Sequence, residues 1–401
     1  RGNIPMAQSD IFADPIMGEP YLLTPGPLTT AQSVKQAMLR DWGSWDDDFR
    51  SMTRSMCSQL LALVGDEKDE FSCVPMQGSG SFCVEAMLGT LVPRNGKVLV
   101  LANGAYGLRA AEIMRYIGRE FTLIDKGDYM PPRGDEVGVA LDSDHSITHV
   151  IAIHCETSSG VLNPIEEIST ATYARGRKLL IDSMSAFGAI DIDVNNIRYE
   201  AMVSSANKCI EGVPGFGFVI ARTLELSKCK GNSHSLALDV YAQWTNFVKT
   251  GQWRYTPPTH VVAAFLEALR IHAAEGGCAG RLVRYTQNRD VVVAGMRKLG
   301  FETLLSDRWL SPIIVTFFCP AHKNFLFPGF YNLMKKKGFI IYPGKLTTVE
   351  SFRIGCIGRM DENVMLRVVK AAEETLAEMG VSNATPPAEA LLEKAKLEAL
   401  G

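Results

Sequence analysis

Val203-Ser-Ser-Ala-Asn-Lys-Cys-Ile210 and Leu179-Leu-Ile-Asp-Ser183 are two short runs in which apolar or small residues lead to one charged side chain. Strands that are buried on both faces of a parallel sheet have near-continuous apolar sequences of this kind. The two runs therefore predict two such strands, with Lys208 and Asp182 at or near their ends.

The segment from about 70 to 222 repeats this pattern. Strands are predicted at Lys97–Asn103, Thr148–His154 and Gly217–Ala221, in addition to the two runs above. Helical patterns over 106–116 and 164–173 separate them. Buried strands that alternate with helices indicate an α/β fold with a mostly parallel, seven-stranded sheet covered on both faces.

The rest of the chain predicts a smaller α+β domain. Helical patterns at 259–276, 280–298 and 361–379 surround candidate strands at 313–317, 338–342 and 352–355. We therefore expect an N-terminal extension (1–20), a large domain (21–260, with an arm at 21–50), a small domain (261–380) and a loosely held helical tail (381–401).

Composition narrows the class of protein. The chain has 401 residues, of which 46% are hydrophobic and 21% charged, with a net charge of −3. These values are typical of a globular enzyme and argue against a nucleic-acid partner. No apolar run is long enough to span a membrane. The nine scattered cysteines suit reduced thiols in the cytoplasm, with an organellar form left open, and neither they nor the seven histidines have the spacing of a metal site.

Lys208 and Asp182 together predict a pyridoxal phosphate site. A lysine amine forms a Schiff base with the aldehyde of this cofactor, and a carboxylate keeps the ring nitrogen protonated. Alone, a carboxylate at a strand end is usually a turn former and a lysine is usually solvated. The pair carries the prediction.

Three further groups fit the same cofactor, although each also has a structural explanation. Ser79, Gly80 and Ser81 open a helical pattern, where they form either a phosphate cradle or a capping turn. Tyr106 either stacks on a planar ring or packs under its loop. Thr157 either donates to the cofactor oxygen or belongs to a polar turn.

Arg353 is flanked by apolar residues, so if it is buried it needs an anion. That anion is either an internal carboxylate or the acid group of a substrate, which a guanidinium binds in bidentate fashion. The Thr24–Thr30 segment, rich in Gly and Pro, is predicted to be a loop. Trp45-Asp-Asp-Asp48 is predicted to be a helix cap.

Assembled, these residues resemble the class V, aspartate-aminotransferase-fold (fold type I) group of pyridoxal phosphate enzymes from about Tyr21 to Ala377. Within it the chain is most similar to the transaminases that use 2-aminoethylphosphonate and pyruvate. The motifs that carry the resemblance include Leu22–Thr30, Trp45–Asp48, Gln77–Ser81, Asn103–Gly107, Ser204–Ile210, Leu238–Trp244, Trp253–Thr256, Tyr342–Lys345 and Phe352–Gly355.

The resemblance assigns a role to each matched residue. It implies that Lys208 and Asp182 are catalytic, as the Schiff-base lysine and the partner of the ring nitrogen. It also implies that Ser79, Gly80 and Ser81 bind the cofactor phosphate. It places Tyr106 on the ring and Thr157 at the ring oxygen. It implies a homodimer in which Thr256 reaches the partner's phosphate. The substrate acid group is expected at Arg353, with the turn residues Gly26, Pro27, Leu28 and Thr29 beside it.

The implied reaction gives phosphonoacetaldehyde and L-alanine, as in phosphonate catabolism. The alternative is an alanine–glyoxylate or serine–pyruvate aminotransferase. A cysteine desulfurase needs a cysteine in a mobile loop, which the chain lacks, and a catalytically silent protein would not need both Lys208 and Asp182.

Overall fold

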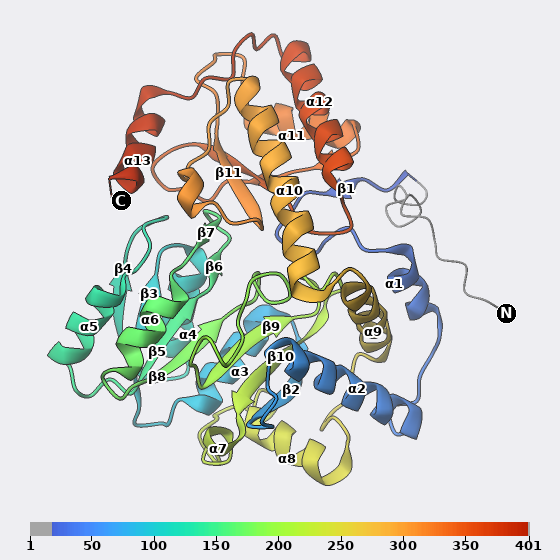
Figure 1. Ribbon diagram of the computed structural model, residues 1–401, viewed down its shortest axis with the longest axis vertical. Coiled ribbons are helices and arrows are strands. Elements are labelled where there is room, and N and C mark those ends of the chain that lie inside the picture. Colours follow the sequence, from blue (N-terminus) through green and yellow to red (C-terminus); the bar gives the residue numbers. More distant parts are fainter. Residues whose placement is uncertain (1–17, 400–401) are drawn as a thin grey trace.

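The structure, a computed structural model, describes residues 18–399. A large domain lies below a smaller one in Figure 1, and helix α10 (Gly277–Lys298) runs between them. The predicted extension at 1–20 lies almost entirely outside the described residues. The helices of the large domain are α1 (Gln32–Gln36), α2 (Asp47–Leu63), α3 (Gly80–Leu91), α4 (Ala105–Tyr116), α5 (Gly134–Ser143), α6 (Ile165–Tyr173), α7 (Thr223–Leu226), α8 (Val240–Thr250) and α9 (Thr259–Ala274).

The large domain is built on a seven-stranded sheet with the order β2-β10-β9-β8-β5-β3-β4. Only β10 runs against its neighbours, so the predicted mostly parallel sheet is confirmed. The strands are β2 (Phe71–Gly78), β3 (Lys97–Ala102), β4 (Glu120–Asp125), β5 (His149–Ile153), β8 (Lys178–Asp182), β9 (Ala201–Ser205) and β10 (Gly215–Arg222).

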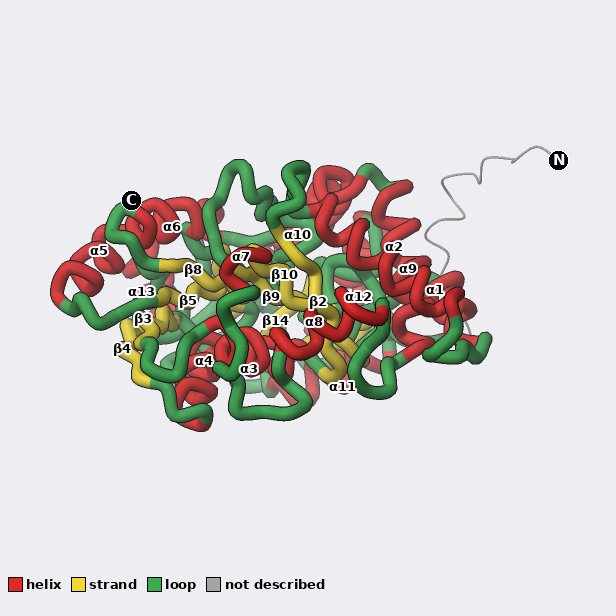
Figure 2. The backbone as a smooth tube through the Cα atoms, turned by 90° about the horizontal axis from the view of Figure 1, so that it is seen from below, coloured by secondary structure: helices red, strands yellow, loops and turns green. Residues whose placement is uncertain are grey.

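Successive residues of the strands point to opposite faces of this sheet, and each face has its own core. Leu99 and Leu101 of β3 join a core with α2, α5, α6 and α9. Val98 and Val100 join the other core, with α3, α4 and α8. Figure 2 shows the strands between these two layers of helices. The continuous apolar runs in the sequence therefore reflect strands that are buried on both faces.

The small domain has an aromatic core around Phe301, Phe317, Phe330 and Phe352. An antiparallel sheet has the order β11-β14-β13, and β1 pairs with β12 in a parallel pair. The elements are β1 (Tyr21–Leu22), β11 (Ile314–Phe318), β12 (Phe339–Ile340), β13 (Tyr342–Pro343), β14 (Ser351–Gly355), α11 (Phe327–Lys336), α12 (Glu362–Glu378) and α13 (Ala388–Glu398).

Three boundaries differ from those predicted. Tyr21 and Leu23, which the prediction assigned to the arm of the large domain, lie in the core of the small domain. Helix α9 packs in the core of the large domain, which moves the division to the Gly276–Gly277 turn. Helix α13 is held, not loose, because Leu397 is buried in the small domain and the Tyr129 hydroxyl bonds to Glu393.

The remaining features of the fold concern the acidic cluster at the start of α2, the cysteines, membrane-spanning helices and metal-binding groups. Asp46 caps α2 through a 2.9 Å bond from the backbone N–H of Asp47, as predicted for the acidic cluster. None of the nine cysteines is paired. Between residues 18 and 399, no helix is long and apolar enough to cross a membrane. In the same range no group of His, Cys, Asp or Glu side chains has an arrangement that could hold a metal ion.

Candidate active site

Asp182 and Lys208 lie at the same edge of the large sheet. Strands β8 and β9 are parallel neighbours, and Asp182 at the end of β8 pairs in register with Val203. Lys208 follows three residues after the end of β9. Strands β3 and β5 end at this edge too, and Tyr106 and Thr157 come soon after them. In open α/β sheets, ligands bind just outside the carboxyl ends of the strands.

Asp182 is a buried carboxylate whose charge has little compensation. One oxygen, Oδ1, accepts a 3.0 Å bond from the backbone N–H of Met184. Burial raises the pKa of Asp182 to about 6, although the positive charge of Lys208 acts in the opposite direction. A cation placed against this carboxylate would therefore lower the pKa and keep Asp182 ionised.

Lys208 is a partly buried amine held in a turn. Burial lowers the pKa of Lys208 to about 8, and the negative charge of Asp182 partly offsets the effect. The Nζ atom donates a 2.8 Å bond to the carbonyl of Pro25. A Cβ atom on Gly26 would lie 2.8 Å from Cδ of Lys208 and 2.9 Å from Nζ, so the turn can pass the lysine only with glycine at this position.

The predicted phosphate cradle is the N-terminus of α3. Ser79 is the N-cap residue, and Gly80 and Ser81 form the first turn, where backbone N–H groups are free to bind an anion. A Cβ atom on Gly80 would lie 2.6 Å from the sulfur of Met184, which sits two residues after Asp182. Arg109 donates a 2.9 Å bond to the Ser81 hydroxyl, so a cation that the sequence did not single out lies at the cradle.

Tyr106 is half-buried in the first turn of α4, and a buried carboxylate holds that turn in place. Glu156 accepts bonds from the backbone N–H groups of Tyr106 and Gly107, at 2.8 and 3.1 Å. Its other oxygen accepts a 2.7 Å bond from the Ser158 hydroxyl. Burial raises the pKa of Glu156, and these bonds oppose the rise. Glu156 therefore joins the Tyr106 turn to the turn that contains Thr157.

Arg353 of the small domain reaches into the large domain. Its side chain is fully buried; Nη1 donates a 2.6 Å bond to the carbonyl of Thr157 and Nε a 2.9 Å bond to that of Pro343. The third nitrogen, Nη2, is buried and has no hydrogen-bond partner among the residues that the structure describes. No carboxylate in that part of the chain forms an ion pair with Arg353. Of the two anions considered from the sequence, an internal carboxylate is therefore not the one observed.

Comparison with known proteins identifies the family. The model of the class-V aminotransferases matches residues 80–324. A 2-aminoethylphosphonate–pyruvate transaminase of Rhizobium meliloti is 71% identical over 96% of this chain and 100% of its own length. Another such transaminase, from Paraburkholderia xenovorans, is 67% identical over 96% of this chain and 98% of its own.

The chain belongs to the 2-aminoethylphosphonate–pyruvate transaminases.

A solved structure agrees with this fold. The pyridoxamine–pyruvate aminotransferase of Mesorhizobium loti superposes with a TM-score of 0.82 at 20% identity, covering 96% of this chain and 99% of its own. The cofactor of a class-V transaminase is pyridoxal 5′-phosphate, and the residues present fit it. Lys208 would supply the amine, the ring nitrogen would give Asp182 an ion-pair partner that it does not have among residues 18–399, and the start of α3 would offer N–H groups to the phosphate.

For the remaining predicted site residues of this transaminase, the structure shows no side-chain hydrogen bond to Lys208, Asp182 or the cradle. Thr256 is exposed. Its carbonyl accepts a 3.2 Å bond from the side chain of Gln77, which comes two residues before Ser79 of the cradle. Leu28 is buried in a small core cluster, and the Thr29 hydroxyl accepts a bond from the backbone of Leu22. Pro27 is exposed. The backbone at Pro25 and Gly26 is what faces Lys208, so substrate contacts by residues 27–29 and the partner contact of Thr256 stay predictions.

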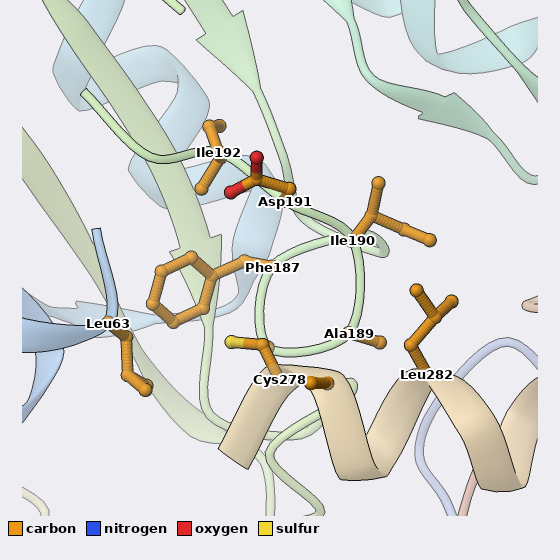
Figure 3. Close-up of a pocket in the computed structure, with 10 residues that line it drawn as sticks. Leu63, Phe187, Ala189, Ile190, Asp191, Ile192, Cys278 and Leu282 are labelled. Carbon is orange, nitrogen blue, oxygen red and sulfur yellow. The ribbon is translucent and has the colours of Figure 1, made fainter. Parts of the chain in front are cut away.

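A separate cavity of about 260 Å³ contains none of these residues. It lies between the start of α10 and the loop that follows Asp182, and Figure 3 shows its mainly apolar lining. The side chains around it include Phe187, Ile190, Cys278 and Leu282.

Proposed function

We propose that the protein transfers the amino group of 2-aminoethylphosphonate to pyruvate, giving phosphonoacetaldehyde and L-alanine. The observation that carries this proposal is 71% identity to a transaminase of this name over that relative's full length. The assembled Lys208, Asp182 and Arg353 support it. Bound pyridoxal phosphate supplies the ring that accepts electrons from the substrate carbon.

Lys208 moves the proton in this reaction. With the cofactor bound, the Nζ of Lys208 would take a proton from the substrate carbon that bears the amino group and would later return one. Burial lowers the pKa of Lys208 to about 8, so a useful fraction of the amine is neutral and basic near neutral pH. Asp182 holds the proton on the ring nitrogen, and its anionic form is favoured once that cation lies beside it.

Arg353 orients both substrates. The free Nη2 and the buried guanidinium are suited to an acid group, and a phosphonate or a carboxylate can accept from it. Since the two substrates use the site in turn, one arginine serves both halves of the reaction. Residues 26–29 would line the same pocket.

The protein acts as a homodimer in this proposal. Phe82, Leu108 and Tyr255 are large apolar or aromatic side chains that are 52%, 43% and 45% exposed. Phe82 and Leu108 lie in the first turns of α3 and α4, and the carbonyl of Tyr255 accepts a bond from Gln77. Apolar surface of this kind marks protein interfaces, and here it lies next to the residues of the cradle. A second copy would cover it and bring Thr256 to the partner's phosphate. The unpaired cysteines support a cytoplasmic location.

A panel of amino donors tests the proposal. With pyruvate as acceptor, 2-aminoethylphosphonate should give a higher kcat/KM than L-serine, and it should also exceed the value for L-alanine with glyoxylate as acceptor. If serine with pyruvate, or alanine with glyoxylate, gave the higher value, the protein would be a serine–pyruvate or alanine–glyoxylate aminotransferase instead.

A further inference from the structure

Lys345 is a second cation near the acid-group site, and the reaction described above does not use it. Its Nζ lies 5.9 Å from the centroid of the Tyr106 ring. Arg353 is close to the same tyrosine: burial lowers the pKa of Arg353, and the hydroxyl groups of Tyr106 and Tyr342 oppose this effect. Lys345 and Arg353 therefore approach one aromatic side chain, the one expected to stack on the cofactor.

The two cations are brought there by one small sheet. Tyr342 of β13 pairs in register with Arg353 of β14, and the guanidinium lies 4.8 Å from the Tyr342 ring centroid. The chain then turns at Gly344, whose N–H donates a 3.1 Å bond to the carbonyl of Ser351. A Cβ atom on Gly344 would lie 2.2 Å from that oxygen, so glycine lets the strands approach. Lys345 follows this close turn, and its side chain is exposed.

Neither cation is held in an ion pair by the described residues, although the negative charge of Glu156 acts on Arg353. Within residues 18–399, no carboxylate forms an ion pair with Lys345 or Arg353, and Nη2 of Arg353 has no hydrogen-bond partner. The site therefore presents two positive charges. The phosphonate of 2-aminoethylphosphonate can lose two protons and so carry up to two negative charges, as a phosphate monoester does, whereas a carboxylate carries one.

We propose that Lys345 binds the phosphonate of the amino donor together with Arg353, and that it recognises the second negative charge. The inference rests on the proposed function and adds the residue that separates the two substrates. Arg353 alone balances the carboxylate of pyruvate. Lys345 contributes mainly when the bound acid group is a dianion, so it favours the donor over the acceptor.

The test compares Lys345→Gln with wild type, both as holoenzymes. We expect kcat/KM for 2-aminoethylphosphonate to fall about tenfold, because a charge-assisted hydrogen bond is lost, and kcat/KM for pyruvate to change by less than about twofold. Lys345→Arg should keep most of the wild-type value for the donor. Lys335→Gln removes the same charge from an exposed position on α11 and should change neither value.

Calorimetry on the same holoenzymes separates binding from turnover. At a pH high enough to make ethylphosphonate a dianion, this ligand should bind about tenfold more weakly to Lys345→Gln than to wild type, and propionate should bind about equally well. Equal losses for both ligands, or no loss for either, would overturn the proposal: the first shows a general anion site and the second a solvated lysine. If wild type did not use 2-aminoethylphosphonate at all, the proposed function would fail first.

Discussion

Burial shifts the protonation of the two central residues in opposite directions. It raises the pKa of Asp182 to about 6 and lowers the pKa of Lys208 to about 8. Both shifts favour the neutral form, because a charge is costly away from water. The site without cofactor therefore carries an unfavourable charge at Asp182, and a protonated ring beside this carboxylate would remove the cost.

Replacement of Asp182 by asparagine should stabilise the cofactor-free protein, because it removes the buried charge. The folded pKa of about 6 lies above the ordinary value of 3.8, so the folded protein binds the proton more tightly than the unfolded one. The stability of the cofactor-free wild type therefore falls as pH rises from 3.8 to about 6. Asp182→Asn lacks this loss and should be the more stable of the two at pH 7, by on the order of 2 kcal/mol.

Thermal unfolding of both cofactor-free proteins at pH 5 and pH 7 measures this difference. The advantage of Asp182→Asn should grow between the two values, while its turnover with cofactor falls by at least about 100-fold, since the ring nitrogen loses its anion. A cofactor-free wild type that is more stable than Asp182→Asn at pH 7 would contradict the account.

Sequence reasoning found the residues whose chemistry is unusual for their position and missed those that act by position alone. Lys208, Asp182 and Arg353 interrupt apolar runs, which makes them visible in the sequence. Glu156 was missed because its partners, the backbone N–H groups of Tyr106 and Gly107, are about fifty residues away along the chain. The sequence around a carboxylate at a strand end does not indicate that this carboxylate will accept hydrogen bonds from the first turn of a distant helix.

At the scale of elements, the turn between β1 and α1 links the two domains through Lys208. Strand β1 pairs with β12 in the small domain. A few residues later, the carbonyl of Pro25 accepts a hydrogen bond from Lys208 of the large domain. Gly26 has a φ of 116°, a value that favours glycine. Both its backbone conformation and the nearby lysine therefore require a residue without a side chain.

Gly26→Ala should disturb the lysine as well as the turn. A Cβ atom would lie within 2.9 Å of Lys208 Nζ, so we expect kcat to fall at least about tenfold and Tm to decrease. Gly118→Ala is the control, because Gly118 has a similar left-handed φ of 67° but no neighbour within 4 Å of the added atom. This control should lose only stability. Equal kcat values for the two variants would mean that the turn does not position Lys208.

Five strands of the large sheet (β3, β5, β8, β9 and β10) were predictable from the sequence, but β2, β4 and the domain boundaries were not. Apolar runs such as those of β3 and β5 mark strands buried on both faces. The apolar pattern of helix α9 does not indicate which of the two domains the helix packs against. The structure shows that its residues Phe265 and Leu269 join the core of the large domain. The two-residue β1 is too short to carry a pattern, so its pairing with β12 had no local signal.

At the scale of the whole molecule, the site depends on both domains and, in our proposal, on a second copy. Arg353 of the small domain donates to Thr157 of the large one. Exposed Phe82 lies one residue after the cradle. A partner that covers this surface would also exclude water from the phosphate, which strengthens the charge-assisted bonds there.

Phe82→Glu should therefore shift the protein from dimer to monomer and weaken its retention of cofactor. A buried charge at an apolar interface is costly, whereas the side chain is exposed in a single chain and its own fold should survive. Light scattering after size exclusion gives the mass. Leu366→Glu, at a 58% exposed position on α12, serves as the control and should remain a dimer. If Phe82→Glu kept the mass of wild type, the interface would lie elsewhere.

The most direct test is to reduce the purified holoenzyme with borohydride and locate the label by peptide mass spectrometry. Reduction fixes pyridoxal phosphate to the lysine amine that holds it. The account predicts one modified peptide, with the label on Lys208, and no label after prior treatment with 2-aminoethylphosphonate in the absence of pyruvate. A label on another lysine, or no label at all, would contradict it.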